Sequence, residues 1–120
     1  MVVHRKKLGA LAEQQACDFL QAKGLTVLEK NYRTASGEID LIMRDDRDIV
    51  FIEVRSRKQS HYGSAVESIN ETKQRKILNT SLLFLQQRNW LDKVDCRFDV
   101  IGIDHGCIEW IRDAFTADIL

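Results

Sequence analysis

The sequence contains no proline, and no apolar run in its 120 residues approaches the length of a membrane span. A helix that crosses a bilayer needs roughly 20 apolar residues. The basic N-terminal residues 1–7 lead into an amphipathic segment, whereas a secretory signal would continue with an apolar stretch. We therefore expect a cytoplasmic protein without a membrane segment.

Cysteine is also scarce, with Cys17, Cys96 and Cys107 far apart in the chain. An odd number of cysteines cannot pair completely within one molecule, and no CxxC spacing suggests a zinc site. The sequence therefore predicts reduced and mostly buried thiols.

Net charge is absent as well, because 18 basic residues balance 18 acidic residues. The charges are unevenly placed, however. Residues 10–53 hold five cations and nine anions, whereas residues 54–76 hold six cations and two anions. Neutrality thus excludes a general polycation but leaves room for a locally basic site. With 44% hydrophobic residues, residues 1–120 are expected to form a single globular domain.

Two helices are expected from apolar residues at three- and four-residue steps. The first spans residues 8–23, and Gly24 is a suitable C-cap. The second spans about residues 70–87, with Ser68 and Glu71 as a capping box. The predicted buried stripes comprise Leu8, Leu11, Ala12, Ala16, Phe19 and Leu20 in the first helix, and Ile77, Leu78, Leu82 and Leu85 in the second.

The remaining apolar runs predict strands. A short strand after Leu25 should end in a turn at residues 31–33, and four further strands are expected at 38–43, 49–56, 96–103 and 107–111. The element order is α-β-β-β-α-β-β. This order predicts an α/β fold with a mixed central sheet flanked by helices.

Acidic residues on two successive strands suggest a site. If strands 38–43 and 49–56 form an antiparallel hairpin whose paired residue numbers sum to 93, residues 46 and 47 make a two-residue turn. In that register Asp40 faces Glu53, with Cβ atoms about 5 Å apart. Arg55 shares a strand face with Glu53, because strand side chains repeat every two residues.

Two facing carboxylates repel each other and need a neutralising partner. Here the candidates are Arg55, a bound Mg²⁺ or Mn²⁺, or both. Mg²⁺ is typically held by one or two carboxylates together with water and substrate phosphate. The pattern therefore suggests a metal-dependent phosphodiester site, although a solvated ion pair would have the same spacing. Glu38 is expected to be structural or a strand-edge partner.

Several ordered motifs carry a family resemblance. The most specific are Gly37–Ile42 (GEIDLI) and Val50–Val54 (VFIEV), and the others are Gly9, Glu13, Ala16, Leu20, Gly24, Asn31–Arg33, Arg57, Gly63, Lys73 and Arg97–Val100. With these motifs the chain resembles the YraN-type family of uncharacterised bacterial proteins over nearly its whole length. That family is similar to archaeal Holliday-junction resolvases and to the restriction-endonuclease-like PD-(D/E)xK superfamily.

The resemblance implies a restriction-endonuclease-like core and a site for Mg²⁺ or Mn²⁺. The implied metal ligands are Asp40, Glu53 and the main-chain carbonyl of Val54, with Glu13 completing the acidic cluster. Lys73 would contact phosphate. The partner would be DNA, bound through its phosphates by the basic residues Arg57, Lys58, Lys73, Arg75 and Lys76. Relatives in the superfamily often dimerise, so a homodimer is a further expectation.

The chain departs from the superfamily pattern at Arg55, where a lysine is expected. Arginine can stabilise charge on a phosphate. It cannot deprotonate to activate water, because its pKa stays above about 12. Three hypotheses therefore stand: a metal-dependent endonuclease acting on branched or damaged DNA, with Glu13, Asp40, Glu53 and Arg55 as its catalytic residues; a catalytically weak or inactive nucleic-acid-binding module; and a protein-interaction domain on a nuclease scaffold.

Overall fold

The computed structural model describes residues 2–56 and 67–116, with side chains from residue 9 onward. Its elements are α1 (Val2–Ala22), β1 (Thr26–Thr34), β2 (Gly37–Asp45), β3 (Asp48–Ser56), α2 (Glu71–Gln87), β4 (Cys96–Asp104) and β5 (Cys107–Phe115). The five strands form one sheet in the order β1-β2-β3-β4-β5, with only the β3–β4 pair parallel. The predicted mixed α/β fold and element order are confirmed. Within the described residues, no helix is apolar and long enough to span a bilayer.

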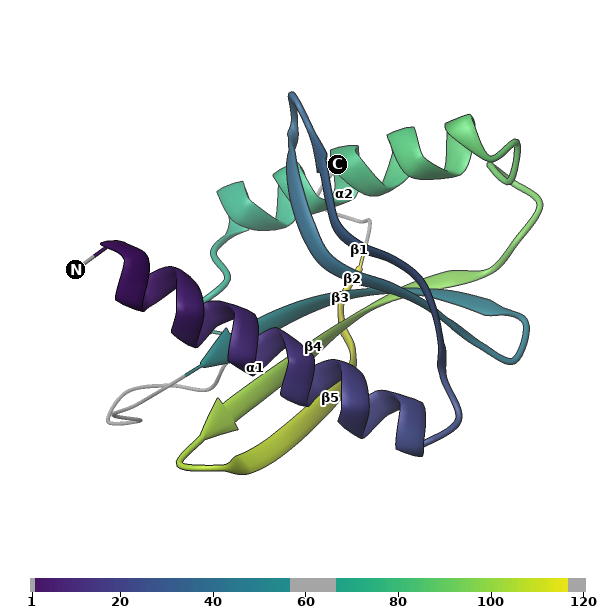
Figure 1. The fold of residues 1–120 in the computed structure, drawn as a ribbon. Helices are drawn as coiled ribbons and strands as arrows, with labels where there is room; N and C mark the ends of the chain where they lie inside the picture. The colour runs from purple at the N-terminus through teal and green to yellow at the C-terminus, as the bar shows by residue number, and fades with distance from the viewer. Residues whose placement is uncertain (1, 57–66, 117–120) are drawn as a thin grey trace.

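The two helices cover opposite faces of this sheet (Figure 1). On β3, Val50 and Ile52 face α1, whereas Phe51 faces α2. This alternation is the period-two pattern of a strand buried on both faces. Helix α2 also connects the parallel strands β3 and β4, as a crossover connection must.

Helix α1 buries a narrower stripe than its sequence predicts. Ala12, Ala16 and Leu20 are buried, but Leu11 is 55% exposed. The helix ends as expected at Gly24, whose φ of +100° lies in the left-handed region that glycine adopts readily.

Helix α2 starts from a different cap. Its N-cap is Asn70, whose side-chain oxygen accepts a hydrogen bond from the Lys73 N–H at 2.9 Å. The predicted Ser68–Glu71 capping box is therefore wrong. The helix begins at Glu71, so the cap belongs to the residue just before it, and asparagine caps as well as serine does. Leu82 is 36% exposed, and Phe84 lies in the core instead.

Strand β1 is longer than predicted. The expected turn at 31–33 is wrong, because these residues pair with β2 through Tyr32↔Ile39 and Arg33↔Glu38. Asn31 adopts a positive φ of 52° within the strand, a conformation that asparagine tolerates. Local sequence therefore suggested a turn where long-range pairing keeps the chain extended.

The β2–β3 hairpin has the predicted register. Its pairs run from Asp45↔Asp48 to Leu41↔Ile52, so paired numbers sum to 93. The turn falls at residues 46–47, and Asp46 takes a φ of 57°. Backbone pairing stops at Leu41↔Ile52, one step before Asp40 and Glu53.

The beginning of β2 coils away from the plane of the sheet. Ile39 packs in the core under α2, whereas Leu41 packs in the core under α1, although strict alternation would put both on one face. In Figure 1 the β1–β2 hairpin rises beside α2. The coiling follows the right-handed twist that is strongest in a two-stranded ribbon.

Strand β5 continues beyond the predicted end at 111. A bulge at Asp113, with φ 51°, lets pairing resume at Phe98↔Phe115. The buried Asp99 carboxylate holds this bulge, because it accepts hydrogen bonds from the Asp113 N–H and from Trp110 Nε1, both at 2.9 Å. We infer a structural role for Asp99 from these contacts.

The three cysteines are free, as expected, but only Cys17 is buried. The prediction that the thiols are mostly buried is wrong, because Cys96 and Cys107 begin β4 and β5, where the strand ends reach solvent.

The cap at Asn70 generates a stability prediction. Replacing Asn70 with alanine leaves the Lys73 N–H without its acceptor, and we expect a loss of about 1 kcal/mol in the free energy of unfolding. Asn70→Asp keeps an acceptor and should stay near wild type. Urea unfolding midpoints measure both variants. Equal midpoints for the alanine and aspartate variants would show that Asn70 is not the cap.

Candidate functional site

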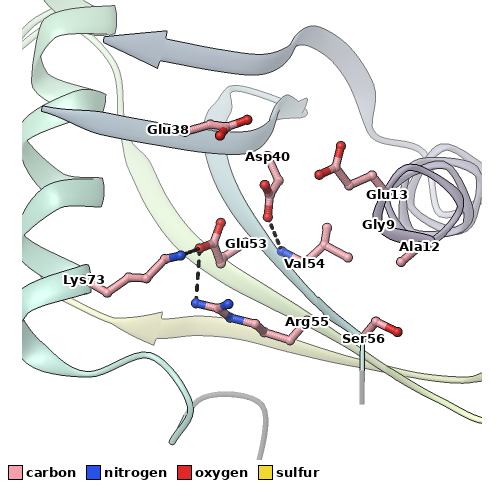
Figure 2. A pocket seen from close by; sticks show the side chains of 10 residues that line it. All are labelled: Gly9, Ala12, Glu13, Glu38, Asp40, Glu53, Val54, Arg55, Ser56 and Lys73. Atoms are coloured by element: carbon pink, nitrogen blue, oxygen red, sulfur yellow. Dashed lines mark hydrogen bonds and ion pairs between the residues drawn. The ribbon is translucent and has the colours of Figure 1, made fainter. Parts of the chain in front are cut away.

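A pocket opens where β2 and β3 stop pairing, between α1 and α2 (Figure 2). Its volume is about 180 Å³. It is lined by Gly9, Ala12, Glu13, Glu38, Asp40, Glu53, Val54, Arg55, Ser56 and Lys73. The structure thus brings together all four predicted catalytic residues, the predicted backbone ligand Val54 and the predicted phosphate contact Lys73.

Asp40 is held by the backbone of β3. Its Oδ2 accepts a hydrogen bond from the Val54 N–H at 2.8 Å, in the place of a backbone carbonyl of the departing strand. The N–H and C=O of one strand residue point to the same side. The Val54 carbonyl is therefore also directed toward the gap between β2 and β3.

Glu53 is a buried carboxylate, only 5% exposed, with two cations on one oxygen. Lys73 Nζ lies 3.2 Å and an Arg55 terminal nitrogen 3.4 Å from Oε2 of Glu53. Lys73 reaches this oxygen from α2 and Arg55 from the same strand (Figure 2). A carboxylate this deeply buried needs such partners whenever it is ionised.

Even with these cations, the pKa of Glu53 is high. Burial, followed by hydrogen bonding and charge repulsion with Asp40, raises the pKa of Glu53 from 4.5 to about 8. Lys73 and Arg55 lower it only in part. Two adjacent carboxylates cannot both ionise freely, so the Asp40–Glu53 pair retains a proton near neutral pH.

Glu13 faces Asp40 from α1 (Figure 2). Its pKa is raised, first by burial and then by the Asp40 charge, while a hydrogen bond with Asn31 lowers it. Glu13 therefore forms a third acidic group of the same cluster.

Glu38 lines the pocket too, and the sequence analysis missed it. Residues 38 and 40 are two apart on β2, so strand alternation puts both side chains on one face, and both line the pocket. Glu38 pairs with Arg33 at 3.2 Å, so its charge is partly balanced. The two-residue spacing from Asp40, together with the Gly37–Ile42 motif, is the sequence signal that could have found Glu38.

The predicted DNA-binding cations separate into groups. Lys73 lies in the pocket, and Lys76 lines an adjoining groove. Arg75 lines neither, and it pairs with Glu71 at 2.9 Å on the exposed surface. Arg57 and Lys58 lie outside the described residues.

The oxygen atoms in the pocket that could ligate a metal ion suit a hard divalent cation only in part. Among the described residues, no three His, Cys, Asp or Glu side chains form a metal-holding group. The set instead comprises two carboxylates, Asp40 and Glu53, and the Val54 carbonyl. One or two carboxylates with water are what Mg²⁺ commonly uses in proteins. In addition, the buried Nε of Arg55 has no hydrogen-bond partner among these residues, which leaves a donor for an incoming acceptor.

The fold and the pocket together define a mixed α/β protein with an acidic pair, Asp40 and the buried Glu53, where two strands of its central sheet stop pairing. The chain belongs to the uncharacterised protein family UPF0102, which matches residues 12–103. A UPF0102 protein of Nitrosococcus oceani is 44% identical over 119 residues, covering 96% of this chain and 95% of the relative. The proteins called UPF0102 protein YraN in Salmonella newport and Salmonella heidelberg are each 47% identical over 113 residues, covering 93% of this chain and 86% of theirs. The family predicted from the motifs is confirmed.

The raised pKa of Glu53 predicts a pH-dependent stability. Between pH 4.5 and about 8 the folded chain retains a proton that the unfolded chain releases, so stability falls as pH rises through this range. Glu53→Gln removes this titration. In buffer with a chelator, we expect its stability relative to wild type to increase by about 1 kcal/mol or more from pH 5.5 to pH 8.

Thermal unfolding at the two pH values measures this change. Glu29→Gln is the matched control, because Glu29 pairs with Arg88 near the surface at 3.4 Å. Its difference from wild type should be the same at both pH values. A Glu53→Gln difference that is equally constant would contradict the raised pKa.

Proposed function

We propose that this protein hydrolyses phosphodiester bonds in DNA with Mg²⁺ or Mn²⁺, as a cytoplasmic endonuclease acting on branched or damaged DNA. The observation that carries the proposal is the convergence of Asp40 and Glu53 with Arg55 and Lys73 in one pocket. The motif resemblance to resolvases and restriction endonucleases supports the same chemistry. The substrate class rests on that resemblance and on the cations beside the acids.

Asp40, Glu53 and the Val54 carbonyl are the groups that would hold the metal ion. When bound, Mg²⁺ or Mn²⁺ supplies an activated water and polarises the phosphate. The Val54 N–H holds the Asp40 carboxylate at the gap through Oδ2. Glu53 must release its proton to act as a ligand, so binding should be weaker at lower pH.

Arg55 and Lys73 supply positive charge on the other side of Glu53. Arg55 has a buried Nε without a partner among the described residues, and a phosphate oxygen is a suitable acceptor for it. Lys73 is 44% exposed in its side chain, so it can reach a ligand from its position on Glu53. Both cations would stabilise negative charge that develops on the phosphate. Glu13 adds an acceptor beside Asp40 for water.

Arg55 also favours a second candidate function. An arginine at the motif position keeps phosphate affinity but cannot act as a base. The chain would then be a nucleic-acid-binding module with weak or no cleavage. This candidate predicts DNA affinity that falls steeply with salt, and no gain from Arg55→Lys.

Metal binding can be tested without activity. A cation that binds only the folded protein raises its stability, by about 1.4 kcal/mol at a concentration ten times the dissociation constant. We expect Mn²⁺ to raise the unfolding temperature of wild type at pH 8, and not that of Asp40→Asn. Glu71→Gln, at the exposed pair with Arg75, should respond as wild type does. Equal shifts in wild type and Asp40→Asn would place the ion elsewhere.

Cleavage is tested on duplex, flap and four-way-junction DNA with Mg²⁺, with Mn²⁺ and with EDTA. We expect metal-dependent products from wild type and at least a hundredfold slower cleavage by Asp40→Asn and by Glu53→Gln, because each loses a ligand. Glu71→Gln is again the control. Cleavage that is identical in wild type and both pocket variants would exclude catalysis at this site.

Arg55→Lys separates the two candidate functions. Faster cleavage by this variant would show that the arginine limits an existing enzyme. Salt-sensitive binding without cleavage by either protein would establish the binding module instead. If Mn²⁺ does not change the unfolding temperature and the protein does not bind DNA at low salt, the remaining hypothesis is a protein-interaction domain.

A further inference from the structure

A second, larger groove adjoins the acidic pocket. It has a volume of about 380 Å³ and lies between the start of β2 and the first half of α2. Its polar lining comprises Glu38, Asn70, Thr72, Lys73 and Lys76. Because Glu38 and Lys73 line both spaces, the groove and the pocket are neighbours that share a wall.

Gly37 sets the width of this groove. A Cβ on Gly37 would lie 3.3 Å from the Cβ of Lys76 and 3.3 Å from Oγ1 of Thr80. The φ of Gly37 is +152°, so a side chain there would also strain the backbone. The β1–β2 turn therefore packs directly against α2 beside Lys76, and two packed elements form the walls of the groove.

The groove is positively charged where it leaves the pocket. Lys73 and Lys76 are three residues apart on α2, so they are neighbours on one helix face, with Cβ atoms about 5–6 Å apart. Within the described chain, Lys76 forms no ion pair with a carboxylate, whereas Arg75 pairs with Glu71. The acid in the groove lining, Glu38, is paired with Arg33.

We propose that this groove binds the phosphate next to the one in the acidic pocket, with Lys76 as its principal contact and Thr72 as a hydroxyl donor. The inference rests on the proposed function, because the pocket must take the first phosphate. The nucleic-acid strand then runs from Asp40 and Glu53 past Lys73 to Lys76. The substrate is therefore a strand with at least two consecutive phosphates.

The test measures binding of a fluorescent single-stranded oligonucleotide in EDTA, which prevents cleavage, at several salt concentrations. We expect Lys76→Gln to weaken binding about five- to tenfold near 0.1 M salt and to reduce the salt slope by about 1. Arg75→Gln, one residue away with the same loss of charge, should change both much less. Both side chains are exposed, so circular dichroism should confirm folded variants.

A second set of oligonucleotides locates the contact. Each carries one neutral methylphosphonate in place of one phosphate. One position should weaken binding to wild type as much as Lys76→Gln does, and the same substitution should add little when the protein is Lys76→Gln. Equal losses for Lys76→Gln and Arg75→Gln, or additive losses at every position, would overturn the groove assignment.

The cleavage and binding results together distinguish failure of the proposed function from failure of the groove assignment. If wild type cleaves no DNA with any metal but Lys76→Gln still shows the selective loss, the groove assignment stands and the hydrolase assignment falls. If wild type cleaves DNA and Lys76→Gln behaves like Arg75→Gln, the hydrolase stands and the groove assignment falls. If wild type does not bind at low salt, the groove assignment is wrong.

Discussion

The hydrogen bond from the Val54 N–H to Asp40 Oδ2 is the interaction on which the site depends. Strand β2 pairs with β3 only from Leu41 onward, and the unpaired start of β2 leaves backbone donors of β3 without a strand partner. The Asp40 carboxylate satisfies one of these donors at 2.8 Å. The same bond therefore ends the ladder and holds a carboxylate beside Glu53, against their mutual repulsion. The opening between the strands and the acidic pair are a single structural feature.

Holding Asp40 and Glu53 close together costs free energy when both are ionised. Burial raises the pKa of Glu53, and neither Lys73 nor Arg55 reverses the shift. The surrounding sheet can tolerate this cost because both of its faces are packed, with Phe51 under α2 and Val50 under α1. If the site binds a divalent cation as proposed, Glu53 must release its proton when the cation binds. Electrostatic strain and metal affinity would thus have the same origin.

Sequence reasoning predicted what depends on local periodicity. The hydrophobic alternation and the two-residue turn were enough to find the hairpin register, and the register was enough to bring Asp40 to Glu53. It failed where tertiary contacts decide the backbone. Coiling of β2 puts Ile39 and Leu41 in different cores, and long-range pairing keeps Asn31 in a strand. Likewise, Lys76 and Arg75 are adjacent cations in the sequence, and the structure distinguishes them: Lys76 lines the groove beside Gly37, whereas Arg75 pairs with Glu71.

Arg55 stands where the superfamily pattern has a lysine, and the folded structure brings a different lysine to the same place. Along the strand, the position two residues after Glu53, where the resemblance expects a lysine, holds Arg55. In the folded chain, the Lys73 ammonium reaches the same Glu53 oxygen from α2. It lies 3.2 Å from Oε2 of Glu53, and the Arg55 guanidinium nitrogen lies 3.4 Å from it. A lysine and an arginine differ in geometry and hydration, so the pair offers both a compact charge and a planar donor. Two elements thus place positive charge on Glu53, where the sequence pattern alone offers only Arg55.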